Sequence, residues 1–252
     1  MGTYLALELR RIARDPFSML FTIGIPAMMY VIFGATMSYG DQDMGNANVA
    51  MYIMINMSAY GAVTATTGVG GMAALERMQG WGRQLGLTPM PDSQFVVIKA
   101  IIGVVQAAIP VAIIYTIGFF TGAKAAWWVW LSSGLLVMVG AALFSLYGLT
   151  VGSLFRSESA VGVSSGLVVI FGFLGNVFIP LSGWMLTVAK FTPLYGIAAL
   201  ARRPATEGLS VNIDSGELIT EPLWQILVNV GAWVTIFAVA SVLLVRRGRE
   251  RQ

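Results

Sequence analysis

The chain has 252 residues, of which 57% are hydrophobic and 11% are charged, and its mean hydropathy is +0.77. Soluble domains carry about 25% charged residues, so this composition excludes a disordered protein, a nucleic-acid-binding protein with a basic face and an ordinary soluble enzyme. The chain has no Cys and no His. It therefore has no disulfide, zinc–thiolate or iron–sulfur site, and it lacks the commonest catalytic base and transition-metal ligand.

Residues 1–15 are predicted to form a helix that lies in the membrane interface. Leu5, Leu9 and Ile12 recur at helical spacing, while the charged side chains Arg11 and Arg14 fall on other faces. A frayed, charged tail is the alternative interpretation. The apolar stretch that follows is too long for a signal peptide and shows no clear small-residue cleavage site.

Six segments are long and apolar enough to cross a bilayer as helices, which takes about 20 residues. They cover residues 17–37, 49–74, 95–120, 127–155, 160–180 and 223–245. Residues 180–203 are also largely apolar, but Gly183, Lys190 and Pro193 interrupt them, so we interpret this segment as a re-entrant or interfacial hairpin. Residues 204–221 then form a loop on the same side. The predicted fold is an all-α membrane protein, with residues 1–252 as one transmembrane domain.

The basic residues are distributed unevenly between the two sides of this six-span arrangement. The side that holds both termini carries 11 of the 15 basic residues, and the other side carries Lys124, Lys190, Arg202 and Arg203. Because Lys and Arg are enriched in cytoplasmic loops, both termini and the loops after the second and fourth spans are predicted to be cytoplasmic. Trp127, Trp128 and Trp130 stand where the fourth span meets the outer interface, as aromatic belts do.

The span interiors contain almost no ionisable side chains, which weighs against a proton-driven or sodium-driven carrier. Their neutral polar residues either line a substrate path or hydrogen-bond to a neighbouring helix, and the packing role is the favoured one for each; they are Asn56, Gln106, Asn176 and Asn229. Two pairs of glycines at GxxxG spacing predict close helix contacts without saying with which partner; these are Gly148 with Gly152 and Gly162 with Gly166.

The sequence contains no nucleotide-binding or catalytic motif that has both the required residues and the required structural context. A phosphate-binding loop needs Gly-Lys-Ser/Thr, but Lys99, Lys124 and Lys190 follow Ile, Ala and Ala. The segment 68–73 loosely matches a dinucleotide fingerprint, but it ends an apolar helix and does not join a strand to a helix. The expectation is that this chain holds no metal and no cofactor, and that any ATP is hydrolysed by another chain.

The loop after the second span is charged at its start and amphipathic in its middle. A short helix there should stop near Leu87, because Pro89 disfavours helical backbone in Thr88. A short helix wedged between two long spans suits a docking element, and a solvated connector is the alternative. Its candidate contact residues, in order, are Glu76, Arg77, Gly80, Trp81, Arg83, Leu85, Thr88 and Pro89.

This loop resembles that of the ABC type-2 exporter permease family, which reads Glu-Arg, spacer, Gly, Leu-Leu, x, Thr-Pro and a Lys that opens the next span. A second match lies in 175–202, with an aromatic-Pro-Leu turn, an apolar hairpin and Pro-Leu-Tyr before an Arg. The matched hairpin residues are Phe178, Pro180, Pro193, Tyr195 and Arg202. Trp81 and Arg83 depart from the family pattern, which often has Thr and an acidic residue there.

The resemblance implies a concrete assembly. A second permease subunit, the same or similar, would pair with this chain, and two ABC ATPase subunits would bind the ATP and Mg. Residues 76–89 would form the coupling helix seated on the ATPase, and the hairpin 180–203 would close the outer side of the path. It would be located in the bacterial inner membrane. Typical substrates are drugs, as in multidrug efflux and antibiotic resistance, lipids, glycoconjugates or peptides.

Two other classes remain as alternatives. An ion-coupled carrier or channel would show flux that follows an ion gradient without ATP. A membrane-embedded lipid-modifying enzyme or its assembly factor is disfavoured, because the chain has no His or Cys and no carboxylate pair in its spans. The sequence favours a hydrophobic or amphiphilic cargo but does not name it.

Overall fold

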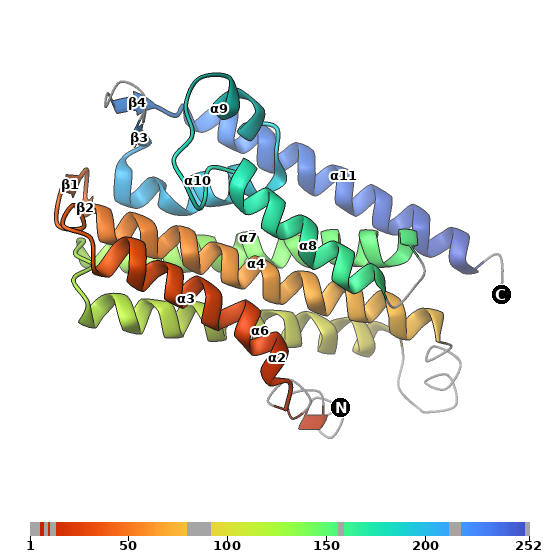
Figure 1. The fold of residues 1–252 in the computed structure, drawn as a ribbon. Coiled ribbons are helices and arrows are strands. Elements are labelled where there is room, and N and C mark those ends of the chain that lie inside the picture. The colour runs from red at the N-terminus through yellow and green to blue at the C-terminus, as the bar shows by residue number, and fades with distance from the viewer. Residues whose placement is uncertain are drawn as a thin grey trace.

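The computed structural model describes residues 6–7, 10, 14–79, 92–155, 159–211 and 218–249, which form a helical bundle with two short β-hairpins (Figure 1). The first helix is continuous from Pro16 to Ala35 in four pieces: α2 (Pro16–Met19), η1 (Leu20–Gly24), α3 (Ile25–Tyr30) and η2 (Val31–Ala35). The remaining elements are β1 (Asp43–Met44), β2 (Ala47–Asn48), α4 (Val49–Met78), α6 (Asp92–Phe120), α7 (Trp127–Phe155), α8 (Ser159–Leu174), α9 (Gly183–Ala189), α10 (Pro193–Thr206), β3 (Leu209–Val211), β4 (Leu218–Thr220) and α11 (Leu223–Arg249).

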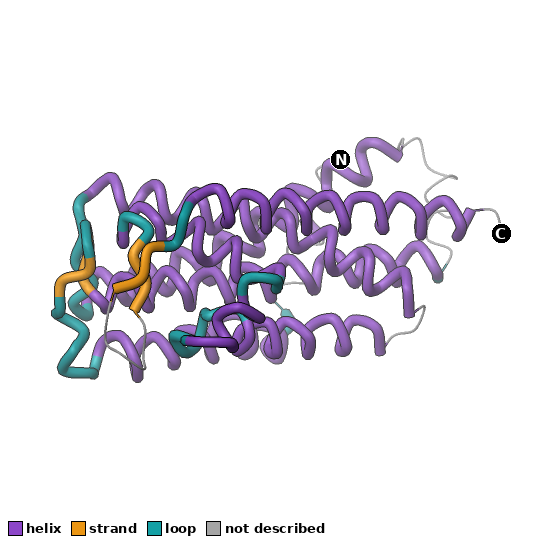
Figure 2. The backbone as a smooth tube through the Cα atoms, turned by 90° about the horizontal axis from the view of Figure 1, so that it is seen from above, coloured by secondary structure: helices purple, strands orange, loops and turns teal. Residues whose placement is uncertain are grey.

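The two ends of the bundle carry different elements. One end, the β-end, holds the antiparallel pairs β1–β2 and β3–β4, and the opposite end, the termini end, holds the start of α2 and the end of α11 (Figures 1 and 2). Because α2 begins and α11 ends at the same end, the chain traverses the bundle an even number of times.

The first helix contains two π-helical stretches, η1 and η2, in place of regular α-helix. Pro26 has no N–H to donate to the carbonyl of Thr22. The turn before it closes with the wider bond from the Ile25 N–H to the Leu20 carbonyl. The carbonyl of Thr22 instead lies against α4, where a Cβ on Gly61 would stand 2.7 Å from it. The irregular turn thus lets two backbones approach closely.

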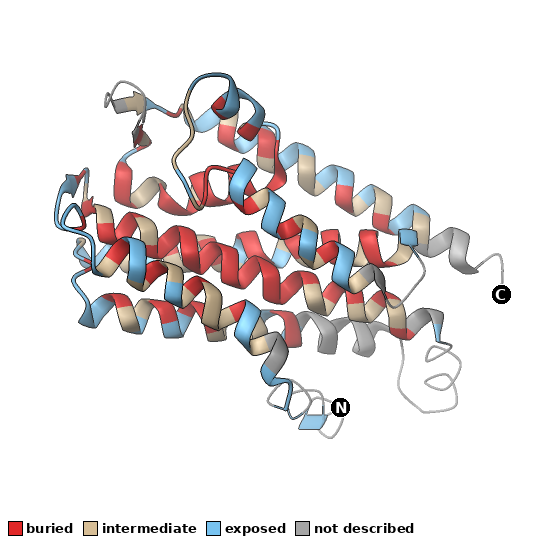
Figure 3. Ribbon diagram, viewed as in Figure 1, coloured by how far each residue is buried: buried red, intermediate tan, exposed pale blue. Residues whose placement is uncertain are grey.

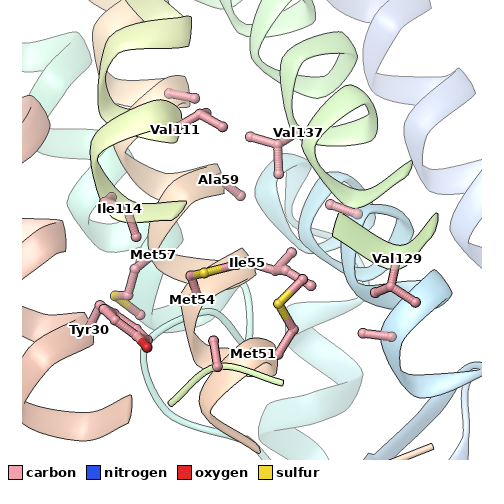
Figure 4. Close-up of a cluster of buried hydrophobic side chains, with 14 of the residues drawn as sticks. Tyr30, Met51, Met54, Ile55, Met57, Ala59, Val111, Ile114, Val129 and Val137 are labelled. Carbon is pink, nitrogen blue, oxygen red and sulfur yellow. The ribbon is translucent and has the colours of Figure 1, made fainter. Parts of the chain in front are cut away.

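Helix α4 is the centre of the bundle. Its apolar window is 89% buried, and the other helices surround it (Figure 3). Methionine side chains fill much of the core between α4 and its neighbours, together with Tyr30, Ile55 and Val137 (Figure 4). Flexible thioether side chains suit such irregular gaps. A helix with no solvated or lipid-facing stripe must be covered on every side, which explains its position.

Among the described residues, four helices are long and apolar enough to cross a membrane: Val49–Glu76, Ile101–Phe120, Trp127–Phe155 and Leu223–Leu244. They correspond to the predicted second, third, fourth and sixth spans. The predicted first and fifth spans are present as the shorter apolar helices Leu20–Ala35 and Val161–Leu174. The predicted break before the last span is a pair of helices, α9 and α10, bent by 96°; counted as one, this bent helix pair makes up to five candidate spans.

The predicted fifth span extended too far, to residue 180. Helix α8 ends at Leu174, and Asn176 then takes a left-handed backbone conformation with φ of 58°. The turn that follows is as apolar as the helix before it, so hydropathy does not mark the boundary. The residue type at position 176 does mark the end of the helix, because Asn is among the few residues that adopt a left-handed backbone conformation easily.

Candidate functional site

An open groove of about 560 Å³ lies along one face of α4, between the first helix, α6 and α8. A volume of this size suits a drug-sized ligand, since ligand pockets commonly measure about 300–1,000 Å³. The groove is an extended concave surface within the helical bundle, and its walls come from four helices that are distant in sequence. Residues along it include Thr22, Tyr60, Gly68, Ile102, Gln106, Val161 and Val169.

The walls of the groove are mainly apolar, with a few neutral polar groups. Thr64, Gln106 and Ser165 supply these groups from α4, α6 and α8. Asp15 and Glu76 lie along the groove toward the termini end. Such a mixture can hold a hydrophobic or amphiphilic molecule, because apolar contacts bind it and a few polar groups orient it.

Three glycines that line the groove have no packing partner in the described chain. A Cβ placed on Gly68, Gly162 or Gly166 would meet nothing within 4 Å. The other GxxxG pair behaves differently, because a Cβ on Gly148 would overlap the Thr67 carbonyl and one on Gly152 would lie 2.8 Å from the Ala74 Cβ. Gly148 and Gly152 therefore serve the α7–α4 contact, while Gly162 and Gly166 leave the groove open.

The four predicted path residues do not lie together. Gln106 lines the groove, whereas Asn56, Asn176 and Asn229 are buried elsewhere. The Asn229 Nδ2 donates to the backbone carbonyls of Lys190 (2.7 Å) and Thr192 (3.1 Å), between α9 and α10. The Asn176 Oδ1 accepts from the Leu181 N–H at 2.7 Å. In these two residues the side chain holds the backbone around the bent helix pair.

The residues predicted to form an outer gate surround the bent helix pair. Phe178 packs edge-on against Tyr60 of α4, with ring centroids 4.6 Å apart. Pro180 lies in the turn before α9, and Pro193 is the first residue of α10, where the missing N–H of proline costs nothing. The Tyr195 hydroxyl donates to Glu221 Oε1 at 3.0 Å. The described structure thus places all four within the bent helix pair or directly before it.

A buried ion pair in this region was not expected from the sequence. Arg202 is completely buried and its Nη2 lies 3.0 Å from Glu221 Oε1, which is itself only 3% exposed as a residue. The charge distribution along the sequence predicts Arg202 among the basic residues of the side opposite the termini. A helical face of small and apolar residues one and two turns before Arg202 (Tyr195, Ala198, Ala199) was the available signal that its side chain is buried.

Asn48 is a second buried polar residue whose role no motif in the sequence indicates. Its Nδ2 donates to the Gly122 carbonyl at 2.7 Å, and its Oδ1 accepts from the Lys124 N–H at 2.9 Å and the Met51 N–H at 3.0 Å. Asn48 therefore caps the start of α4 and fixes the α6–α7 loop to it.

Most of the predicted ATPase-contact residues lie outside the described residues, namely Gly80, Trp81, Arg83, Leu85, Thr88 and Pro89. Helix α4 runs through Glu76 and Arg77 to Met78, and Glu76 is buried. Of the predicted interfacial helix at 1–15, only residues 6, 7, 10, 14 and 15 are described. The end of α4 and the start of α6 both lie at the termini end (Figure 1).

Comparison with known proteins identifies the family. The family model described as "ABC-2 type transporter" matches residues 2–202. A curated relative, "Putative transport permease YvfS" of Bacillus subtilis (strain 168), is 23% identical over 246 residues, covering 95% of this chain and 94% of the relative. The family resemblance inferred from the loop and hairpin motifs is thereby confirmed. Members of this family are membrane permeases that work with partner ATPase subunits and catalyse no reaction themselves. The chain belongs to the ABC-2 type transporter family, as a multi-pass membrane permease.

Proposed function

We propose that this permease forms, with a second permease subunit that is the same or similar, the path by which an ATP-driven exporter moves a hydrophobic or amphiphilic molecule out of the cytoplasm or the inner leaflet. The observation that carries the proposal is the apolar groove along α4, which opens between the first helix and α8. Drugs, lipids and glycoconjugates are the classes of cargo that such walls suit.

In this proposal the chain crosses the membrane six times. The even number of traverses supports this count, as does the continuous first helix from Pro16 to Ala35. Helix α8 has 16 residues, about 24 Å, which is shorter than a hydrocarbon core of about 30 Å. The bent helix pair would complete that crossing and return the chain to the β-end. The basic residues at both chain ends support a cytoplasmic termini end.

ATP would act on the permease through residues 76–89. Helix α4 is continuous from the β-end to Met78, so a push on the segment after it would be carried along the central helix of the bundle. Since α4 also forms the floor of the groove, such a movement would change the shape of the path. The bent helix pair would close the path at its outer side.

Co-purification with the ATPase tests this proposal. The solubilised wild-type chain should retain an ATPase subunit, and the complex should move substrate only with ATP. Deletion of residues 77–87, or replacement of Glu76, should abolish transport while the chain still inserts into the membrane. Normal ATP-driven transport by the deletion variant would contradict the proposal. Flux that follows a proton or sodium gradient without ATP would favour the ion-coupled alternative instead.

A further inference from the structure

The ion pair between Arg202 and Glu221 joins three separate pieces of the chain. The Arg202 Nη2 donates to both carboxylate oxygens of Glu221, at 3.0 and 3.1 Å. Its Nη1 donates to the backbone carbonyl of Asn176 at 3.1 Å. One guanidinium therefore connects α10, the segment that leads into α11 and the turn that follows α8.

Aromatic side chains complete the surroundings of this pair. The Tyr195 hydroxyl donates to Glu221 Oε1 at 3.0 Å, and the guanidinium stands 5.5 Å from the centre of the Tyr52 ring on α4. A buried ion pair survives desolvation only when its remaining donors and acceptors are well paired, and breaking it leaves an uncompensated charge. Both terminal nitrogens of Arg202 are paired, while its Nε has no hydrogen-bond partner among the described residues. Because opening the pair would leave two buried charges uncompensated, it suits a permanent connection and not a contact that opens in every cycle.

The ion pair holds together the described residues 175–211 and 218–222, here called the bent-pair unit. The attachments of this unit to the rest of the bundle are uneven. It is bonded to α11 through Asn229 and through Trp233, whose Nε1 donates to the Phe191 carbonyl at 3.0 Å. Toward the first helix, α4, α6 and α7, its hydrogen bonds between described residues all come from Asn46, in the β1–β2 turn.

The remaining contacts of the bent-pair unit with α4 and α7 are apolar or aromatic. Ile197 of α10 packs directly over Gly140 of α7, and Phe178 packs on Tyr60. Relative movement at these contacts breaks no hydrogen bond between described residues apart from those of Asn46, whereas movement on the side toward α8 and α11 breaks several. We therefore expect the bent-pair unit to move relative to α4 and α7 and to keep its position relative to α8 and α11.

We propose that Arg202 is a positioning residue for transport: by holding Glu221 and the Asn176 carbonyl, it makes the described residues 175–211 and 218–222 one rigid unit that moves with α8 and the start of α11. The inference rests on the proposed function, in which the bent helix pair closes the path. A displacement of α8 at the groove would then be transmitted to the outer side of the path, because a rigid unit does not deform between its attachments to α8 and α11.

The positioning role of Arg202 can be distinguished experimentally from a role in which the Arg202–Glu221 pair only fills space. Replacing the pair by apolar residues of similar volume, Arg202→Met with Glu221→Leu, should leave a folded protein, because buried ion pairs can be replaced in this way without loss of stability. The same replacement removes the side-chain bonds that Arg202 makes to Glu221 and to the Asn176 carbonyl, while the bond from Arg203 Nη1 to the Glu221 backbone carbonyl remains. The matched control removes the exposed pair Lys124–Asp41, whose Nζ and Oδ1 lie 2.8 Å apart, by Lys124→Gln.

Distance measurements between spin labels can test the proposal, because the chain has no Cys and labels can be placed without background. One pair replaces the exposed Trp184 of α9 and Trp224 of α11, within and beside the unit. A second label pair replaces Trp184 and the exposed Trp127 of α7, which lie on opposite sides of the contact between the bent-pair unit and α7. Both are measured in the complex with its ATPase, with and without ATP, beside transport per ATP hydrolysed.

The 184–224 distance should be single and narrow in the otherwise unchanged chain, with and without ATP, and in Lys124→Gln. It should broaden in Arg202→Met/Glu221→Leu, with unchanged thermal unfolding, and transport per ATP should fall by about an order of magnitude, a typical coupling between sites. A narrow distance and full transport in that variant would overturn the proposal. If the double variant does not fold, Arg202→Lys, which loses the guanidinium fork, must show the same broadening.

The second label pair separates this inference from the proposed function. A 184–127 distance that does not change with ATP would contradict gating by the bent helix pair. The 184–224 result would still decide whether Arg202 contributes to holding the unit together, because the bonds of Asn229 and Trp233 to the α9–α10 connection are the same in every variant.

Discussion

Gly148 of α7 lies so close to the backbone carbonyl of Thr67 on α4 that no side chain fits between them. Gly70 of α4 makes the reciprocal approach, because a Cβ there would overlap the Ser145 carbonyl of α7. Two backbones in contact allow dispersion attraction along the whole crossing, which is the main force available between helices in lipid. The α4–α7 crossing is therefore the fixed frame against which the groove and the bent helix pair are built.

Substituting Ala for Gly148 should destabilise the protein. The new methyl group must displace a backbone and not a flexible side chain, and overpacking of this kind costs about 1–3 kcal/mol. Thermal unfolding in detergent should show a lower midpoint than that of the parent chain. Gly162→Ala is the matched control and should unfold like the parent, since its Cβ would meet nothing within 4 Å. Equal midpoints for the two variants would show that the crossing is looser than described.

Asn48→Ala should loosen the α6–α7 loop. The substitution removes three hydrogen bonds and leaves the Gly122 carbonyl and the Lys124 N–H without this partner, at a cost of about 1–3 kcal/mol for each buried group left unpaired. Hydrogen exchange of residues 121–126 should accelerate, and the midpoint of thermal unfolding should fall. Asn48→Asp retains the acceptor and loses only the donor, so its effect should be intermediate. Exchange as slow as in the parent would refute this role.

Asn229→Leu should release the connection between α9 and α10. The Lys190 and Thr192 carbonyls would lose their side-chain donor, and the expected loss of stability is about 1–3 kcal/mol. Because Asn229 lies away from the groove, the relative transport of different substrates should stay the same while overall stability falls. A changed substrate preference with unchanged unfolding would instead support the path role predicted from the sequence.

The helices of the central bundle could be predicted from hydropathy because long apolar runs have few alternatives in a membrane. The second span was predicted to end near residue 74, and α4 continues only to Met78. The break at Gly183 and Pro193 was also visible, since both residues interrupt a helix, and the structure confirms a bent helix pair there. What hydropathy could not show was the end of α8, because the turn after Leu174 is itself apolar.

The buried polar groups were the hardest features to predict. Charge counting treats every Arg outside a long span as solvated, so Arg202 was assigned to a loop side although its partner Glu221 stands 19 residues later. Pairing across that distance depends on how α10 and the segment before α11 fold back, which no local pattern contains. In the same way, the polar residues Gln106 and Asn229 look alike in sequence, yet one lines the groove and the other binds backbone.

The central claim is that the groove along α4 is part of the transport path, and closing the groove with side chains tests it most directly. Leu at Gly162 and Gly166 would fill the groove without meeting any atom within 4 Å at the Cβ, so the protein should fold normally. Gly231→Leu on α11 is the matched control, because its Cβ also has open space but lies away from the groove. The measurement is ATP-driven substrate flux in proteoliposomes that contain the permease and its ATPase. The account predicts that flux is lost in Gly162→Leu/Gly166→Leu and retained in Gly231→Leu; full flux in the first variant would contradict it.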